Sequence, residues 1–371
     1  MRVLVCPDKF RGTLTAAQAA AAIGRGWARV RPQDAIDLMP LADGGEGTLD
    51  ALLPLADADT TGSRRIAAVV PGPLGDPVDA AVGVRGGTGV VELASASGIG
   101  LMPPERRDPR RTTTAGTGAL MRALLDEDID RLFVCLGGSA TNDGGVGIAR
   151  ALGVSFADVH GVEVPEGGEA LLDLARIDTS GLDRRLGSVD VLGLTDVDNP
   201  LCGPRGASAA FGPQKGASDE DVWVLDRALG HLAAVVHRDL GIDVRDEPGA
   251  GAAGGTGFGL LAFCGARLRP GIEVVMESVG FEPALGAADL VVTGEGSLDV
   301  GSLHGKVPSG VLEAAGLART PVAIVCGRAC IRLEGALVRS LEERVGPTRA
   351  MQDAERSVEL VAGELAGELG R

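Results

Sequence analysis

The feature that most constrains this fold is the alternation of short apolar runs with helical segments at both ends of the chain. Apolar runs bounded by turn residues predict strands, and apolar residues that recur every three to four positions predict helices. The predicted strands cover residues 2–6, 36–39, 290–293 and 322–326, and the predicted helices cover residues 15–30, 46–56 and 308–316, with further helices after residue 326. Such alternation is typical of an α/β domain with a parallel sheet.

The middle of the chain departs from this alternation. Three extended runs, at residues 66–70, 78–84 and 89–93, are joined by Pro-Gly and Gly-Gly turns, which predicts an antiparallel meander. A meander does not continue a parallel βαβ sheet, so it marks the entry into a second domain. The remaining predicted elements are helices at residues 117–126, 219–240 and 251–264 and strands at residues 131–136 and 189–194.

We therefore predict an α/β protein of two domains. Residues 1–60 and 284–371 form one domain around a parallel sheet, and residues 61–283 form an inserted second domain of mixed α/β type. The length of 371 residues fits two cores, because single hydrophobic cores stop growing at roughly 250 to 300 residues.

Composition argues against several classes of protein. The net charge of −16 and the aromatic content of 2% are poorly suited to nucleic acid, which is bound by clustered Lys and Arg and by stacking rings. No apolar run approaches the roughly 18 residues of a membrane span, and the first residues lack the pattern of a signal peptide. We expect a cytoplasmic protein with no membrane or nucleic-acid partner. Its six cysteines show no paired ligand spacing and are expected as reduced thiols.

Lysine is rare in this chain. Among the 35 basic residues only Lys9, Lys215 and Lys306 are lysines, and each lies near glycine in a predicted loop. A lysine that persists against such a bias towards arginine is expected where a compact ammonium is needed and a planar guanidinium would not fit. The alternative is that the three lysines are chance survivors.

A glycine-rich loop at residues 136–147, LGGSATNDGGVG, lies between a predicted strand and a predicted helix. A loop in this position can direct backbone N–H groups and the helix dipole at an anion. It lacks the closing GK[ST] of a P-loop, so an ordinary glycine-rich turn is the alternative. The residues predicted to bind a nucleotide are Gly137, Gly138, Ser139, Thr141 and Asn142, together with Lys215 and Gly294.

A second loop, at residues 294–306, reads GEGSLDVGSLHGK and follows another predicted strand. Ligands of parallel sheets bind at this end of the strands. Glu295 and Asp299 are candidates for holding Mg²⁺ or acting as a base, and Lys306 is a candidate for meeting a phosphate as a point charge. The spacing Gly-x-x-x-Gly-Lys is one residue short of a P-loop, so no P-loop is predicted.

Two further loops, at residues 7–13 and 42–48, leave the first two predicted strands at the same edge of the sheet and are expected to lie side by side. Their candidate residues are Asp8, Lys9 and Arg11 in the first loop and Asp43 and Gly44 in the second. The alternative for the second loop is structural, with Asp43 in a turn and Glu46 complementing a helix dipole.

In the predicted inserted domain, residues 195–201 read TDVDNPL at a strand end. Phosphoryl transfer depends on positioning by a metal, a cation and a base near the attacking oxygen. Asp196 is the candidate base, Asp198 a candidate metal ligand and Asn199 a candidate for binding substrate. An Asx-turn is the structural alternative for these acids.

Taken together, the motifs resemble a known family. In order along about residues 3–315 the chain carries PDKFRGTLTA, PLADGGEGT, TTTAGTGAL, GGSATNDGGVG, DVDNPLCGPRGA, FGPQKGA, GAGAAGG and VVTGEGSLDVGSLHGK, and this set resembles the glycerate kinase family of bacterial type. The resemblance implies a flavodoxin-like domain built from both termini, an inserted α/β domain, and phosphorylation of D-glycerate by ATP with Mg²⁺. It also implies 2-phosphoglycerate as the product.

Under this hypothesis each candidate has a role. Catalysis is assigned to Asp196, Lys306 and Lys9, binding of the hydroxy acid to Asp8, Arg11, Asp43, Gly44, Asn199 and Arg328, and binding of Mg²⁺ to Asp198, Glu295 and Asp299. The chain departs from the family pattern at Lys9, Arg11, Gly301 and the segment 325–328. These departures leave open a kinase that acts on a different hydroxy acid.

Four further points stay open at this stage. A non-catalytic sensor that binds a nucleotide or an acid is an alternative from a different class. Either hydroxyl of glycerate could be the acceptor, and the general base is not decided. The oligomeric state is also open, with a homodimer among the alternatives.

Overall fold

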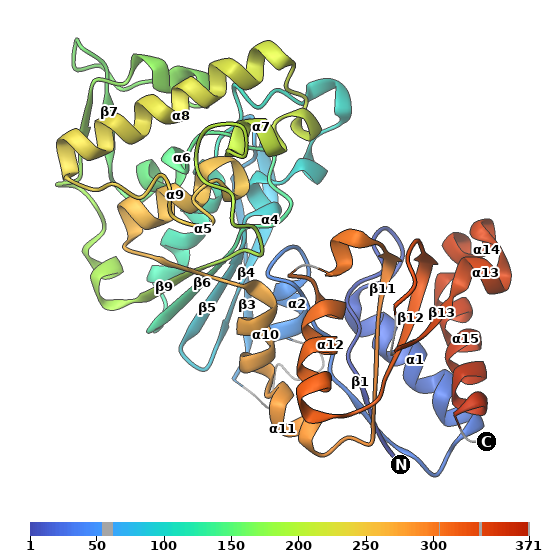
Figure 1. Cartoon of the computed structure of the whole chain (residues 1–371). Coiled ribbons are helices and arrows are strands. Elements are labelled where there is room, and N and C mark those ends of the chain that lie inside the picture. Colours follow the sequence, from blue (N-terminus) through green and yellow to red (C-terminus); the bar gives the residue numbers. More distant parts are fainter. Residues whose placement is uncertain (54–61, 304, 334–335, 370–371) are drawn as a thin grey trace. The chain divides into compact units, whose positions relative to one another are not determined.

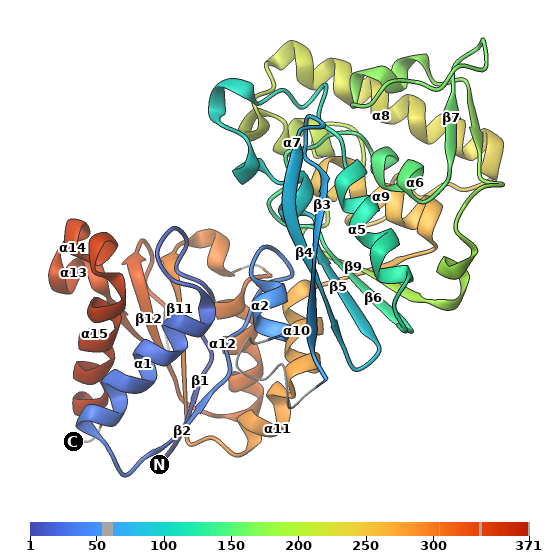
Figure 2. The ribbon, with the colours of Figure 1, turned by 180° about the vertical axis from the view of Figure 1, so that it is seen from behind.

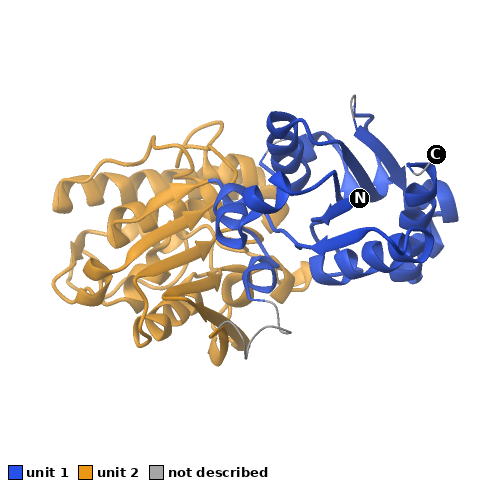
Figure 3. Cartoon of the chain, turned by 90° about the horizontal axis from the view of Figure 1, so that it is seen from below, with its two compact units in different colours: residues 1–54, 270–371 blue, residues 55–269 orange. Residues whose placement is uncertain are grey.

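The computed structural model describes residues 1–53, 62–303, 305–333 and 336–369. The chain forms two compact units (Figure 3). Unit 1 contains Met1–Pro54 and Pro270–Arg371, and unit 2 contains Leu55–Arg269. Both ends of the chain thus build one unit, and the middle of the chain builds the other.

Unit 1 alternates strands with helices along the chain (Figure 1). Its elements are β1 Arg2–Val5, α1 Ala16–Val30, β2 Ala35–Leu38, α2 Thr48–Leu52, α10 Gly271–Val279, α11 Phe281–Gly286, β11 Leu290–Leu298, the 3₁₀ turn η7 Val300–Leu303, α12 Val307–Ala318, β12 Val322–Ala329, β13 Ala336–Ser340, α13 Leu341–Val345, α14 Pro347–Gln352 and α15 Ala354–Glu368.

The unit 1 sheet has five strands in the order β13-β12-β11-β1-β2, and every neighbouring pair is parallel. Counted along the chain, this is the order 2-1-3-4-5 of flavodoxin-like folds. Helices α1 and α15 pack on one face of the sheet, where Val3 and Val5 point, and α12 packs on the other, where Ile324 points (Figure 2). Both faces are covered, which explains why these strands are almost continuously apolar.

Local signals set the first helix of unit 1. The side chain of Thr15 accepts a hydrogen bond from the backbone of Gln18, and the Gln18 side chain bonds back to Thr15, which forms a capping box at the start of α1. Glycine then sets how α1 packs. A Cβ at Gly26 would overlap with the carbonyl of Glu359 in α15, so the two helices can approach closely only with glycine at this position.

Unit 2 is built around a mixed sheet. Its elements are β3 Arg64–Pro71, β4 Pro77–Arg85, β5 Thr88–Glu92, α4 Ala94–Ser97, η2 Ile99–Leu101, η3 Pro104–Arg106, α5 Ala115–Leu125, β6 Arg131–Cys135, α6 Val146–Ala151, β7 Ser155–Ala157, η4 Glu169–Asp173, β8 Arg176–Asp178, η5 Arg184–Ser188, β9 Asp190–Leu194, α7 Ala207–Phe211, η6 Pro213–Lys215, α8 Asp219–Leu240, α9 Ala252–Cys264 and β10 Arg267–Arg269.

Six strands form the unit 2 sheet in the order β10-β9-β6-β5-β4-β3. Strands β3, β4 and β5 are antiparallel, as the predicted meander requires, while β5, β6, β9 and β10 are parallel. Helices α5 and α9 share a core with this sheet, and α8 packs against α6, α7 and α9 in a second core. The loops that follow β6 and β9 therefore leave the same edge of the sheet.

The predicted fold class is confirmed: a flavodoxin-like parallel sheet comes from both termini, and a mixed α/β unit is inserted between them. The predicted domain boundary at residues 60 and 61 lies outside the described residues. Where the chain returns from unit 2 to unit 1, the boundary lies between Arg269 and Pro270, whereas the sequence predicts it between residues 283 and 284. Helices α10 and α11 account for this difference, because they pack against α2 and α12 of unit 1.

Several strands differ from the sequence prediction, among them β11 and β13 of unit 1. Strand β11 continues through Leu298 where a loop is expected after residue 293, because residues 294, 295, 297 and 298 pair with β12. Gly294 permits this pairing, since a Cβ there would overlap with the carbonyl of Val325. Strand β13 is absent from the sequence prediction and is held by its parallel pairing with β12.

Candidate functional site

In unit 1 the strand order reverses between β1 and β11, which is where ligands bind in sheets of this type. The loop after β1 is joined to β11 by a hydrogen bond from the Asp8 N–H to the Gly294 carbonyl, at 2.8 Å. It is joined to the segment after β2 by a bond from the Leu41 N–H to the Pro7 carbonyl, at 3.0 Å. The loops at residues 7–13 and 42–48 therefore lie side by side, as expected.

Lys9 holds these two loops together. Its ammonium donates a hydrogen bond to the backbone carbonyl of Glu46, and its side chain lies against Gly47, whose φ is +95°. Asp43 shapes the second loop by accepting a bond from the Gly45 N–H at 3.1 Å. Asp43 therefore has the turn role considered above, and its other carboxylate oxygen takes no part in that bond.

Four carboxylates interact electrostatically at this edge of unit 1, those of Asp8, Asp43, Glu295 and Asp299. Asp8 is only 7% exposed and accepts a bond from the Lys9 N–H at 2.6 Å. Burial raises the pKa of Asp8 to about 7, and the negative charge of Asp43 adds to the effect. Glu295 contributes a smaller increase to the Asp8 pKa. Such a cluster suits a ligand that brings positive charge or donates hydrogen bonds.

Glu295 lies within β11 and is 6% exposed. Burial raises the pKa of Glu295, while a hydrogen bond with Ser302 and the charge of Lys306 lower it. Asp299 belongs to the same group, because its charge raises the Glu295 pKa. The Oε1 atom of Glu295 is buried and has no hydrogen-bond partner among the described residues. A buried carboxylate oxygen in that state is suited to a cation, a bound hydroxyl or a proton.

The two arginines considered for carboxylate recognition lie at the same side of unit 1. Arg11 is exposed in the loop after β1. Arg328 lies near the end of β12, which extends past the predicted limit at residue 326, and its Nε is 3.8 Å from the Glu342 carboxylate. That ion pair is largely exposed and therefore weak, so Arg328 can exchange it for another anion.

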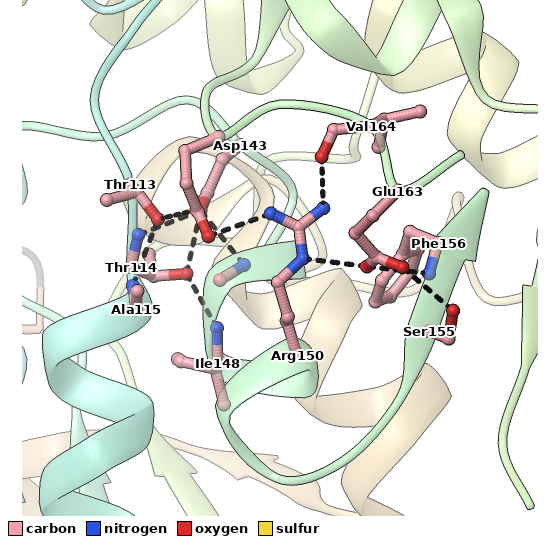
Figure 4. Close-up of polar contacts among 12 residues, drawn as sticks. Thr113, Thr114, Ala115, Asp143, Ile148, Arg150, Ser155, Phe156, Glu163 and Val164 are labelled. Carbon is pink, nitrogen blue, oxygen red and sulfur yellow. Dashed lines mark hydrogen bonds and ion pairs between the residues drawn. The ribbon is translucent and has the colours of Figure 1, made fainter. Parts of the chain in front are cut away.

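In unit 2 the loop after β6 is anchored by Asp143, which is 1% exposed (Figure 4). Its Oδ2 accepts bonds from the N–H and Oγ1 of Thr114, each at 2.8 Å, and from the Gly147 N–H at 3.2 Å. Its Oδ1 accepts from the Gly145 N–H at 3.2 Å. The Ile148 N–H donates to Thr114 Oγ1. The first N–H groups of α6 are thus hydrogen-bonded within unit 2.

The remaining candidates in this loop divide into exposed and buried residues. Gly138 is exposed and Gly137 half-buried, whereas Ser139, Thr141 and Asn142 are buried. The Asn142 amide donates to Ser208 Oγ at 3.0 Å. Lys215 is only 2% exposed, and its ammonium donates to the Thr141 carbonyl at 2.7 Å. The structure brings Lys215 to the loop, but it places the ammonium inside the unit.

The start of α9 packs against this loop. Gly254 has a φ of +69°, and a Cβ there would overlap with the Thr141 carbonyl and lie 2.7 Å from Asn142 Cα. Ala253 also has a positive φ, of 52°. The Gly144 N–H donates to the Gly254 carbonyl at 3.1 Å. The motif GAGAAGG therefore forms a left-handed turn that supports the glycine-rich loop.

The loop after β9 meets the same segment. The Gly251 N–H donates to the Asn199 carbonyl, and the Asn199 side chain donates to the Arg205 carbonyl at 2.7 Å. Asn199 therefore supports the loop. Asp198 lies on the surface in an ion pair with Arg205 at 2.9 Å. Asp196 is half-buried.

The predicted metal ligands are divided between the two units. Asp198 belongs to unit 2, whereas Glu295 and Asp299 belong to unit 1. Across the described ranges, no group of three or more His, Cys, Asp or Glu side chains is arranged to hold a metal ion. One buried carboxylate with an unpartnered oxygen, Glu295, does fit Mg²⁺ that arrives with phosphates, since such ions use only one or two protein carboxylates.

Asp143 and Thr114 were missed as individual site residues by the sequence reasoning, although both lie in quoted motifs. The only signal for their contact was a run of three threonines before a predicted helix and an aspartate within a glycine-rich loop. Their pairing spans 29 positions in the chain, so spacing could not reveal it.

Of the helices in the described residues, none combines the length and apolar character of a membrane span.

Comparisons with known proteins agree with this architecture. The sequence model described as the glycerate kinase family matches residues 3–368. The glycerate kinase of Bacillus subtilis (strain 168) is 48% identical over 329 residues, which is 88% of this chain and 85% of that protein. The glycerate 2-kinase of Escherichia coli (strain K12) is 44% identical over 329 residues, with the same coverage.

A solved structure is similar over the full length. The crystal structure described as glycerate kinase 2 from Salmonella typhimurium LT2 matches with a TM-score of 0.86 and 41% identity, covering 100% of this chain and 98% of that chain. The match to the family model spans nearly the whole sequence, and the solved structure shares the fold. This chain therefore belongs to the glycerate kinase family and is a kinase.

Proposed function

We propose that this kinase transfers the terminal phosphoryl group of ATP to D-glycerate and forms 2-phosphoglycerate. The observation that carries the proposal is the group of carboxylates and lysines at the switch point of the unit 1 sheet, in a chain whose relatives are named glycerate kinase and glycerate 2-kinase. Phosphoryl transfer requires positioned cations and carboxylates and little covalent chemistry from the protein.

For the nucleotide, we propose contacts from the outer part of the unit 2 loop. Gly137 and Gly138 stand at its accessible end with Ser139 buried next to them, and glycine allows a phosphate to approach the backbone. Lys306, which is half-buried, would meet a phosphate oxygen as a point charge. Mg²⁺ would neutralise part of the phosphate charge, and Glu295 is the carboxylate that fits it, with Asp299 beside it.

For the hydroxy acid, we propose that Arg11 pairs with the carboxylate and that Asp8 and Asp43 bind its hydroxyls. Burial disfavours charge on Asp8, so it can either accept or donate a hydrogen bond near neutral pH. Asp196 is the proposed base for the attacking hydroxyl, because it is the half-buried acid at the end of β9. Whether the kinase acts as a homodimer stays a prediction.

A second candidate keeps the kinase and changes the acceptor to another small hydroxy acid. The exposed guanidinium groups of Arg11 and Arg328 favour it, since a larger acid could use both, and Gly301 leaves space beside Asp299. A non-catalytic sensor is disfavoured by the family membership.

A coupled assay of ADP release tests the proposal. Purified protein with ATP, Mg²⁺ and D-glycerate is expected to release ADP in proportion to glycerate, and phosphorus NMR is expected to show the phosphate on the 2-hydroxyl. Other hydroxy acids are assayed in parallel. If ATP binds normally and another acid turns over while D-glycerate does not, the second candidate replaces the first.

A further inference from the structure

Two buried groups that can carry charge lie at the glycine-rich loop of residues 137–147, and phosphate binding offers no role for them. Asp143 is part of the loop, and Lys215 is bonded to it from outside. Asp143 is 1% exposed and Lys215 is 2% exposed, so neither is available to a ligand at the surface of unit 2. Buried ionisable groups are costly unless they are bonded. The bonds they make therefore indicate what they do.

Asp143 uses its carboxylate to shape the loop. Its four hydrogen bonds come from Gly145, Gly147 and both donors of Thr114, so one side chain holds the loop to the start of α5. Figure 4 shows Asp143 beside Thr114. An asparagine at this position would turn an NH₂ group toward some of these donors and could not satisfy them all.

A second set of bonds secures the Thr114 side of this anchor. Thr113 Oγ1 donates to the Glu166 carboxylate and accepts from the Ala115 N–H. Arg150, on α6, then binds Glu166 at 2.7 Å. It also binds Glu163 at 3.1 Å (Figure 4). The start of α5 and the end of α6 are thus cross-linked, so movement of Asp143 would disturb several bonds at once.

Lys215 acts on the opposite part of the loop. Its ammonium donates to the Thr141 carbonyl, and the charge of Asp143 favours its protonated form. Burial lowers the pKa of Lys215 to about 7, so the ammonium is held at a cost in desolvation. Two more acceptors on this loop, Thr141 Oγ1 and Asn142 Oδ1, are buried without hydrogen-bond partners in the part of the chain that the structure describes. The loop interior is thus rich in acceptors, which a compact ammonium with three donors suits.

We propose that Asp143 and Lys215 are positioning residues, which hold the loop at residues 137–147 in the shape that receives the nucleotide phosphates without touching the phosphates themselves. The inference rests on the proposed function, in which the outer residues of this loop bind ATP. It assigns to Lys215 a role different from the phosphate contact that its place in a glycine-rich motif predicts. It also explains why lysine stands here in a chain whose basic residues are almost all arginine.

The test compares Lys215→Met and Asp143→Asn with the wild-type protein. Gln214→Met is the matched control for the first variant, because Gln214 is exposed and adjacent, and Asp246→Asn is the control for the second. Hydrogen exchange is measured on nucleotide-free protein, and dissociation constants for ATP and ADP by calorimetry. Steady-state assays give KM separately for ATP and D-glycerate.

A positioning role predicts three results. Amide exchange within residues 137–147 speeds up at least tenfold in both variants before any nucleotide is added. Affinities for ATP and ADP fall by similar factors, at least tenfold. KM for ATP rises while KM for D-glycerate stays within twofold, a split that a mere loss of folded protein would not produce. The controls change none of these values.

The opposite pattern would overturn the proposal. If amide exchange in the loop is unchanged and Lys215→Met lowers the affinity for ATP much more than the affinity for ADP, Lys215 contacts the phosphates directly. If neither exchange nor affinity changes, the two residues do not position the loop. Should both variants fail to fold, Thr114→Val decides, since it removes only one donor to Asp143 and is expected to speed exchange at Gly145 and Gly147. Absence of ATP binding to the wild-type protein would instead refute the proposed function, and the exchange result would still decide the positioning role.

Discussion

Replacing Asp8 by asparagine is expected to stabilise the protein above neutral pH and to abolish turnover. Asp8 is buried at the end of β1 beside the negative charges of Asp43 and Glu295, and its pKa is raised to about 7. Asparagine has a similar shape and keeps an oxygen that can accept the bond from the Lys9 N–H. It carries no charge, so the variant removes the cost of ionising this site without removing the packing.

The size of the effect follows from the two pKa values. In the unfolded chain Asp8 titrates near its ordinary value of 3.8, and in the folded chain near about 7. At 1.36 kcal/mol per pKa unit the difference corresponds to ~4 kcal/mol. Between these two values the folded protein holds a proton that the unfolded chain has lost. The free energy of unfolding of the wild type therefore falls as pH rises through this window and levels off above it.

The variant cannot titrate at this position and loses that dependence. The gain in unfolding free energy of Asp8→Asn over wild type should therefore grow from near zero at pH 4 to ~4 kcal/mol at pH 8. For a unit of this size that corresponds to a rise in Tm of roughly 10 °C. Activity should be lost, because the carboxylate is proposed to bind the hydroxy acid, and functional sites commonly trade stability for activity.

The assay is denaturant unfolding at several pH values between 4 and 8, together with ADP release at pH 8. Glu313→Gln is the control, because Glu313 is an exposed acid of the same unit on α12. Its unfolding curve should follow the wild type at every pH. The reasoning is refuted if the wild type and Asp8→Asn keep a constant difference in unfolding free energy across the range.

Three further predictions concern single positions. Gly254→Ala should destabilise unit 2 by ~3 kcal/mol or more, because residue 254 has a positive φ and its new Cβ would overlap with the Thr141 carbonyl. Gly265→Ala is the control: Gly265 also has a positive φ, of +61°, but faces open space, so this change should cost only ~1 kcal/mol. Thermal melts compare the two variants. Ser218→Ala should lower the free energy of unfolding by ~1 kcal/mol by removing a capping box, measured by denaturant unfolding. Cys330 is exposed, Cys202 is half-buried and the other four thiols are buried, so a maleimide should label Cys330 faster than any other thiol of the native chain. Equally fast labelling of several thiols would contradict the described burial.

Much of the fold follows from local patterns. Helix α8 spans the predicted residues 219–240, because Ser218 caps its start and Gly241, with a φ of +71°, ends it. The meander follows from its turn dipeptides and the parallel strands of unit 1 from their continuous apolar runs. These signals depend only on neighbours in the chain, so spacing was enough to predict them.

The sequence by itself determined the fold class, the starts of helices such as α1 and α8, and which motifs carry polar and charged groups. Only the tertiary structure decided how far β11 runs and where each charged group lies, because strand length depends on pairing with β12 and burial depends on segments distant in the chain. Lys215 shows the difference. Its motif marks it as special, but only the packing of its side chain against Thr141, 74 positions away, places the ammonium inside the protein.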